Sequence, residues 1–82
     1  MRLEIITPDS AVYTGKIRSV RVPGTKGSFQ ILRDHAPIIS TLENGTVTVV
    51  DFQGKHLFFE ISGGLIEVKM NRIILLAESA HL

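Results

Sequence analysis

The chain has 82 residues, a hydrophobic content of 44%, no cysteine and a formal net charge of +1. This length fits a single domain with a packed core. The lack of cysteine excludes disulfides and thiolate metal sites, and the small net charge predicts no strong affinity for nucleic acid. The longest aliphatic run, residues 73–77, is far shorter than the ~20 residues of a membrane-spanning helix. We therefore expect any connection to a membrane to go through other proteins.

Alternating polar and apolar residues predict short β-strands along the N-terminal part of the chain. The first predicted strand covers residues 2–7. The second covers residues 11–14 and stops at Gly15, and a third covers residues 16–22. Ile17 is out of step with the later valines of this third strand, which predicts a β-bulge or a twist near Ser19.

Two turn-forming clusters bracket one short alternating run in the next part of the chain. The clusters are residues 23–27 and 33–37, and the run between them is residues 28–32. Glycine permits positive φ and proline fixes φ, so both clusters are predicted to be loops. Exposed loops on a rigid sheet often carry function, which makes these two loops the first candidates for a functional surface.

The C-terminal half reads as a strand or turn followed by two hairpins. Residues 38–42 form the strand or turn, residues 45–51 and 55–62 the first hairpin, and residues 65–70 and 72–77 the second. The last of these segments is apolar on both faces, which predicts a strand covered on both sides. Phe58 is expected on an exposed face, where it covers a sheet edge or meets a partner.

No helical apolar period persists anywhere, so the predicted fold is all-β. About eight to ten short strands at regular spacing predict a two-layer antiparallel β-sandwich, or flattened barrel, in one domain. This domain is expected to span residues 1–82.

Basic residues dominate one stretch of the sequence. Between Asp9 and Asp34 there is no acidic residue, but there are five basic ones: Lys16, Arg18, Arg21, Lys26 and Arg33. One interpretation is a solvated strand face. The other is a contact surface for an acidic patch on a partner, where such charges assist steering more than affinity.

None of the short motifs predicts catalysis, a cofactor or a metal. The Gly24–Ser28 segment has its lysine and glycine in the wrong order for a phosphate-binding loop, and a strand follows instead of a helix. Asp34 and His35 lack the third group and the oxyanion donors that a nucleophilic site needs. We expect the His35 imidazole to bond neighbouring backbone. The histidines show no metal-ligand spacing.

Several short motifs in fixed order carry a family resemblance, which runs from Leu3 to Ala80. The order of these motifs resembles the N-terminal β-sandwich domain of the epsilon subunit of bacterial rotary ATP synthases. The motifs are Ile6-Thr7-Pro8, Val12-Tyr13-Thr14-Gly15, Val20-Arg21-Val22-Pro23-Gly24, Gly27 with Ile31-Leu32, His35-Ala36-Pro37-Ile38, Leu42-Glu43-Asn44-Gly45, Ser62-Gly63-Gly64-Leu65-Ile66-Glu67-Val68 and Leu75-Leu76-Ala77-Glu78-Ser79-Ala80.

The resemblance implies a non-catalytic subunit of the central stalk of a proton-translocating ATP synthase. Such a subunit binds the gamma subunit and the c-subunit ring, and it couples ion flow to ATP synthesis. The expected location is the cytoplasmic face of the bacterial inner membrane, as a peripheral part of the complex, without a cofactor. By positional match, the expected partner-binding residues are Lys26, Gly27, Ser28, Phe29, Arg33, His35, Ala36, Pro37 and Thr41. Residues 7–10 and 38–41 are expected to face gamma.

The sequence departs from the family pattern in three places. Phe29-Gln30-Ile31 stands where the family usually has Leu-Gly-Ile, and Arg33-Asp34 stands where it usually has Pro-Gly. Both changes are expected to alter the loop that faces the ring. The family also usually continues into a C-terminal helical hairpin, which this sequence lacks, so we expect no inhibition by such a hairpin.

Two other hypotheses remain open: a small β-barrel module that binds oligonucleotide or sugar, and a small hydrolase built around Asp34 and His35.

Overall fold

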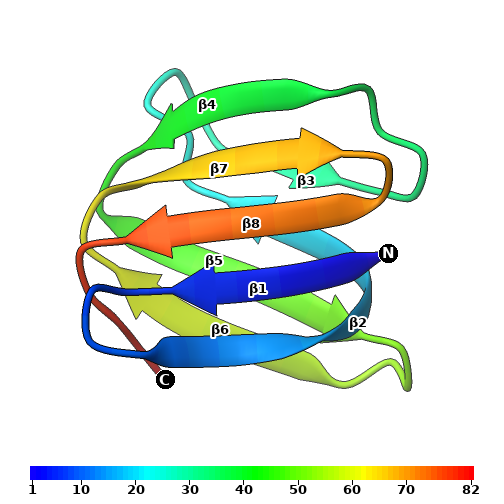
Figure 1. Ribbon diagram of the computed structural model, residues 1–82, viewed down its shortest axis with the longest axis horizontal. Helices are drawn as coiled ribbons and strands as arrows, with labels where there is room; N and C mark the ends of the chain where they lie inside the picture. The colour runs from blue at the N-terminus through cyan, green and yellow to red at the C-terminus, as the bar shows by residue number, and fades with distance from the viewer.

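The computed structural model describes residues 1–82 and contains nine β-strands and no helix (Figure 1). The all-β prediction is therefore confirmed, and two predicted strands, residues 45–51 and 72–77, have the observed bounds. In chain order the strands are β1 (Arg2–Ile6), β2 (Ala11–Val22), β3 (Phe29–Ile31), β4 (Ile38–Leu42), β5 (Gly45–Asp51), β6 (His56–Ile61), β7 (Gly64–Lys69), β8 (Arg72–Ala77) and β9 (Ala80–His81).

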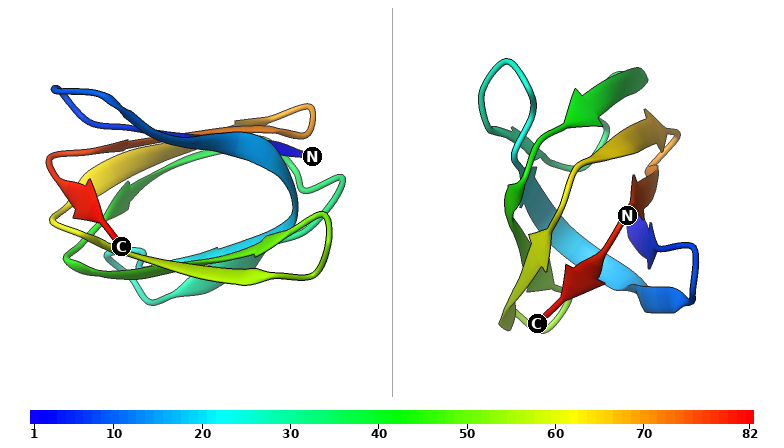
Figure 2. Two further views of the ribbon diagram at one scale, coloured as in Figure 1. Left: turned by 90° about the horizontal axis from the view of Figure 1, so that it is seen from below. Right: turned by 90° about the vertical axis from the view of Figure 1, so that its left-hand side faces the viewer.

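The strands form two layers that share one long strand, β2. The front sheet of Figure 1 has the order β4-β7-β8-β1-β2, and the back sheet contains β3, β5, β6 and β9 together with the second half of β2. Figure 2 shows the two layers edge-on, with β2 curving from one to the other. The hydrogen-bonded path runs from β4 to β9 without closing, so the architecture is a β-sandwich.

The core lies between the two sheets and is apolar, with Ser19 as the one buried polar residue. Strand alternation sends every second side chain inward, so both sheets contribute branched aliphatic residues to one continuous cluster. No buried side-chain nitrogen or oxygen lacks a hydrogen-bond partner. The cluster consists of 16 buried residues: Leu3, Ile5, Ile17, Val20, Val22, Ile31, Leu42, Val47, Val49, Phe59, Ile61, Ile66, Val68, Ile73, Leu75 and Ala77.

β2 differs from the prediction because it passes through Gly15 without stopping. A Cβ at Gly15 would lie 3.0 Å from the Tyr13 phenol oxygen, so the glycine leaves room for this ring inside the strand. The ring packs edge-on against Phe59, with centroids 5.6 Å apart. The register of β2 against β5 shifts between Ile17 and Ser19, which confirms the predicted bulge at the point where β2 changes sheet.

β8 also differs from the prediction in two respects. It pairs with β1 in parallel, whereas every other strand pair is antiparallel. Its second face is not covered: Leu75 is fully buried, but the neighbouring Leu76 is 46% exposed. The prediction of a strand covered on both sides was therefore wrong. The apolar residues on its outer face are available to a partner.

Candidate partner-binding surfaces

The first loop, predicted over residues 23–27, extends over residues 23–28 and is held at its base and exposed at its tip. We call it the glycine loop. The Thr25 backbone N–H donates to the Thr41 carbonyl at 3.1 Å, and the two threonine hydroxyls lie 2.9 Å apart. Gly24 is buried, and a Cβ there would lie only 2.6 Å from the Gly27 carbonyl oxygen. Lys26, Gly27 and Ser28 are exposed beyond this base.

The second loop, predicted over residues 33–37, extends over residues 32–37 and is tied to the turn between β7 and β8. We call it the histidine loop. The Asn71 side-chain oxygen accepts from the Asp34 N–H at 2.7 Å, and the Asn71 amide donates to the Asp34 carboxylate at 3.0 Å. Asp34 has φ of +63°, a conformation that glycine adopts readily. The aspartate therefore preserves a glycine-like turn at the position where the resembled family usually has glycine.

His35 bonds to the backbone of its own loop. Its Nδ1 lies 2.7 Å from the Ala36 carbonyl oxygen, which therefore accepts a hydrogen bond from Nδ1–H. This contact confirms the predicted role as a turn residue. The Asp34 carboxylate bonds Asn71 instead of the imidazole, so the two residues do not form a catalytic dyad. Nowhere in the structure do three or more His, Asp or Glu side chains gather in a way that would hold a metal ion.

The structure divides the nine predicted partner-binding residues between the two ends of β4. The glycine loop lies beside the C-terminal end of β4, and the histidine loop leads into its N-terminal end, as the upper left and upper right of Figure 1 show. Five strand residues separate these ends by about 13 Å. Lys26, Gly27, Ser28, Phe29 and Thr41 lie in the first group, and Arg33, His35, Ala36 and Pro37 in the second.

Sequence reasoning named only the flanks of a third surface, on the outer face of the front sheet, and missed its apolar centre. Thr41, Leu65, Leu76 and Ile6 stand opposite one another on four adjacent strands and form what we call the apolar row. Leu65 is 38% and Leu76 is 46% exposed. Next to them lies a hollow of about 520 Å³ that Thr7 and Pro8 also line. The signal for this surface was present in the sequence, as the two-faced apolar pattern of β8.

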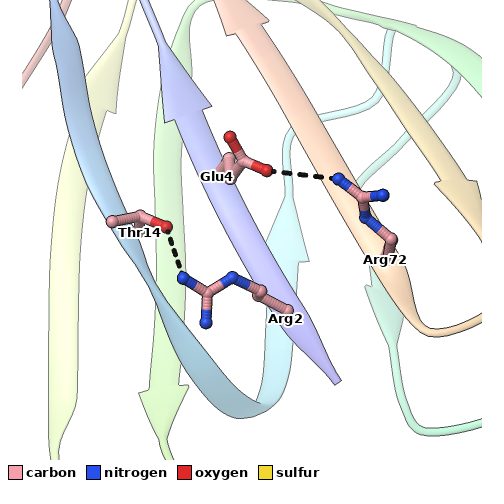
Figure 3. Close-up of polar contacts among 4 residues, drawn as sticks. All are labelled: Arg2, Glu4, Thr14 and Arg72. Atoms are coloured by element: carbon pink, nitrogen blue, oxygen red, sulfur yellow. Dashed lines mark hydrogen bonds and ion pairs between the residues drawn. The ribbon is translucent and has the colours of Figure 1, made fainter.

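The same outer face becomes charged toward its other end. A second row lies two residues away from the apolar row along the strands. It is mixed in character and consists of Ile39, Glu67, Ile74, Glu4 and Thr14. Two residues further lies a row of basic side chains, one on each of β7, β8, β1 and β2. Figure 3 shows where these two rows touch. Arg72 pairs with Glu4 at 3.7 Å and Arg2 donates to the Thr14 hydroxyl at 3.3 Å.

Comparison with known families identifies the chain. Residues 1–82 match the family model described as the ATP synthase, Delta/Epsilon chain, beta-sandwich domain. The chain belongs to this family. Its expected β-sandwich is the architecture observed here, and no helix in the structure is long and apolar enough to cross a bilayer.

Curated relatives and solved structures agree with this assignment. The chain is 42% identical over 80 residues to the ATP synthase epsilon chain of Desulforamulus reducens, covering 98% of this chain and 60% of that one. It is 41% identical over 76 residues to the epsilon chain of Chlorobaculum tepidum, covering 93% and 86%. The chain thus spans about three fifths of the first relative and most of the second.

Two solved assemblies contain chains with the same fold. A chain of the mitochondrial ATP synthase of Euglena gracilis, solved as OSCP/F1/c-ring, superposes with a TM-score of 0.88 at 19% identity, over 96% of this chain and 51% of that one. A chain of the Tetrahymena thermophila central stalk/c-ring gives 0.83 at 14% identity, over 99% and 65%.

Proposed function

We propose that this chain is a non-catalytic rotor component of the ATP synthase central stalk, which binds the gamma subunit and the c-ring and turns with them. Family membership supports a place in ATP synthase, because the curated relatives are epsilon chains of that complex. The similar folds in solved stalk and c-ring assemblies support a place in the rotor. As such a component, the chain would sit peripherally at the cytoplasmic face of the bacterial inner membrane.

The apolar row is the observation that carries the proposed contact with gamma. Residues 7–10 and 38–41, which the family resemblance assigns to gamma, flank Leu65 and Leu76 on the two sides. An ordinary interface buries about 800 Å² per partner, about one sixth of this domain's 5014 Å². Exposed apolar side chains in one row supply the apolar centre that such interfaces have.

The glycine loop supports the proposed contact with the c-ring. Lys26, Gly27 and Ser28 are exposed and polar, while the hydrogen bonds between Thr25 and Thr41 hold their base in place. A protruding polar loop with a fixed base suits contact with the polar loops of another subunit, because little conformational freedom is lost on binding.

Co-purification with the gamma subunit of the same organism tests the proposal. We expect a stoichiometric complex at micromolar concentration, which Leu76→Asp disrupts because it places a charge in the apolar contact. Phe58→Asp is the matched control, since Phe58 is 55% exposed on the back sheet. Absence of a wild-type complex, or equal loss in both variants, would argue against the proposal.

The ring contact has its own test. Ser28→Trp adds bulk to the exposed tip of the glycine loop, whose base is held elsewhere. We expect this variant to keep its thermal stability and its binding to gamma, but to bind an assembled gamma–c-ring complex more weakly than wild type. A fall in thermal stability with ring binding intact would show that Ser28 is only a structural turn residue.

A further inference from the structure

Four basic side chains stand in one straight row at the end of the outer face that lies opposite the apolar row. Lys69 is opposite Arg72, Arg72 is opposite Arg2, and Arg2 is opposite Lys16. All four are exposed, while the residues next to them along the strands, such as Leu3 and Ile73, are buried. We call these four residues the cationic row.

The cationic row carries more positive charge than its surroundings neutralise. Glu4 and Arg72, 3.7 Å apart, form the only ion pair of the structure, and the Arg2 guanidinium donates its hydrogen bond to a neutral hydroxyl (Figure 3). Lys16 and Lys69 have no carboxylate partner. Arg33 of the histidine loop extends the charge, because it lines a hollow of about 300 Å³ together with Arg2 and Lys16. Aligned like charges cost free energy unless another molecule compensates them.

The spacing of the basic side chains in the row indicates what kind of molecule compensates their charge. Neighbouring strands are about 4.8 Å apart, which is close to the roughly 5.4 Å rise of one helical turn. A protein helix with one carboxylate per turn presents an acidic stripe, and each of its carboxylates would face one basic side chain of the row. Exposed Met70 and Phe52 lie beside the two halves of the row, and methionine, aromatic and arginine side chains are enriched in protein interfaces.

We infer that the cationic row binds an acidic stripe on the same protein that covers the apolar row, and so fixes the orientation in which the domain docks. This inference rests on the proposed function, because it takes the partner from there. A single partner fits because both rows lie on one continuous face, about 13 Å apart along the strands. A flat anionic membrane fits less well, since it would also meet Glu4 and Glu67 in the mixed row.

Zero-length crosslinking in the intact ATP synthase tests the inference directly. A carbodiimide joins lysine amines to carboxylates that they touch. We expect Lys16 and Lys69 to be recovered in crosslinks to Asp or Glu of the subunit that covers Leu76. Crosslinks of both lysines to a different subunit would overturn the shared partner, and the absence of any crosslink from either lysine would overturn the contact.

Association kinetics with gamma give a second test with a matched control. The variant Lys16→Gln/Lys69→Gln leaves the Glu4–Arg72 pair intact, and Arg21→Gln/Lys55→Gln removes the same charge from elsewhere. Because steering charges act mainly on association, we expect the first variant to lose about tenfold in association rate at low salt, with little change in dissociation. The control should change by less than about twofold, as expected for charges outside the contact.

The outcomes separate the inference from the proposed function. If wild type does not bind gamma at all, the proposed function is wrong. The crosslinks alone then show whether the cationic row contacts an acidic protein. Equal slowing of association in both variants would show that only net charge matters. It would overturn the inference that the cationic row makes the contact. Capture of wild type by phosphatidylserine vesicles or by single-stranded oligonucleotide, with release by the row variant, would replace the acidic protein with another class of partner.

Discussion

Asp34 and Asn71 lie 37 residues apart in the sequence and bond each other twice, through the Asp34 backbone and its carboxylate. Both residues have positive φ, +63° and +62°. Asn71 also accepts at its carbonyl from the Arg2 N–H at 2.9 Å. One asparagine therefore joins the histidine loop, the turn between β7 and β8, and the start of β1. The position of His35 depends on this contact.

Glycine substitutions at these two positions separate the bonds from the backbone conformation. Glycine tolerates positive φ, so Asp34→Gly removes one side-chain bond and Asn71→Gly removes two without new strain. We expect Asn71→Gly to lower the free energy of unfolding by about 1 kcal/mol more than Asp34→Gly does. Urea denaturation measures both. Equal effects would mean that the bond to the Asp34 N–H contributes nothing.

A second prediction concerns the close approach of β7 and β8 at Gly64. A Cβ at this position would lie 2.4 Å from the Leu76 carbonyl oxygen, which is backbone and cannot rotate away. We expect Gly64→Ala to destabilise the domain by about 3 kcal/mol, at the upper end of overpacking effects.

Gly54→Ala is the control for this prediction. Gly54 has open space around its Cβ position but a φ of +86°, so its substitution should cost only about 1–2 kcal/mol of backbone strain. If thermal denaturation ranks Gly54→Ala as the more damaging change, the close approach at Gly64 is not as tight as described.

A third prediction concerns pH. Burial raises the pKa of the Tyr13 phenol above its usual 10.0, and the negative charge of Asp51 raises it further. The fold therefore favours the protonated phenol. This contribution to stability is fully present below the unfolded-state pKa, near 10, and is lost as pH rises through the higher folded-state pKa.

The sequence makes the pH prediction easy to measure, because Tyr13 is the only tyrosine and there is no tryptophan. Phenolate absorbance should give a titration midpoint above 10 in the folded protein. As pH rises from about 10 through that midpoint, wild type should lose more stability than Tyr13→Phe, which has no phenol to ionise. A midpoint at or below the value in the unfolded chain would contradict the half-buried position of the ring.

Strands with clean alternation could be predicted from the sequence, and those shaped by distant contacts could not. β5 alternates valine and threonine between two turns, which fixed both its bounds and its inward face. β9 has two residues and exists only because Ala80 and His81 pair with β6. The parallel pairing of β1 with β8 likewise depends on how the sandwich closes, because the local pattern of either strand fits both directions.

The candidate surfaces show the same division. Glycine and proline marked both loops correctly, because they act through local φ preferences. The rows on the outer face are set by register between strands far apart in sequence, so Lys16 and Lys69 could not be aligned beforehand. The basic stretch noted in the sequence is not one surface: Lys16 and Arg33 line a single hollow, while Arg21 lies where β2 pairs with β3 and β5.

Thiol labelling of single-cysteine variants tests the docking face most directly, because the chain has no cysteine of its own. Leu76→Cys places a thiol on the outer face of the front sheet, and Phe58→Cys places one on the back sheet at similar exposure, 46% against 55% for the native side chains. Both should react with maleimide at similar rates in the free domain. On binding gamma, Cys at position 76 should become protected while Cys at position 58 stays reactive. Protection at position 58 with position 76 still reactive in a verified complex would contradict the account.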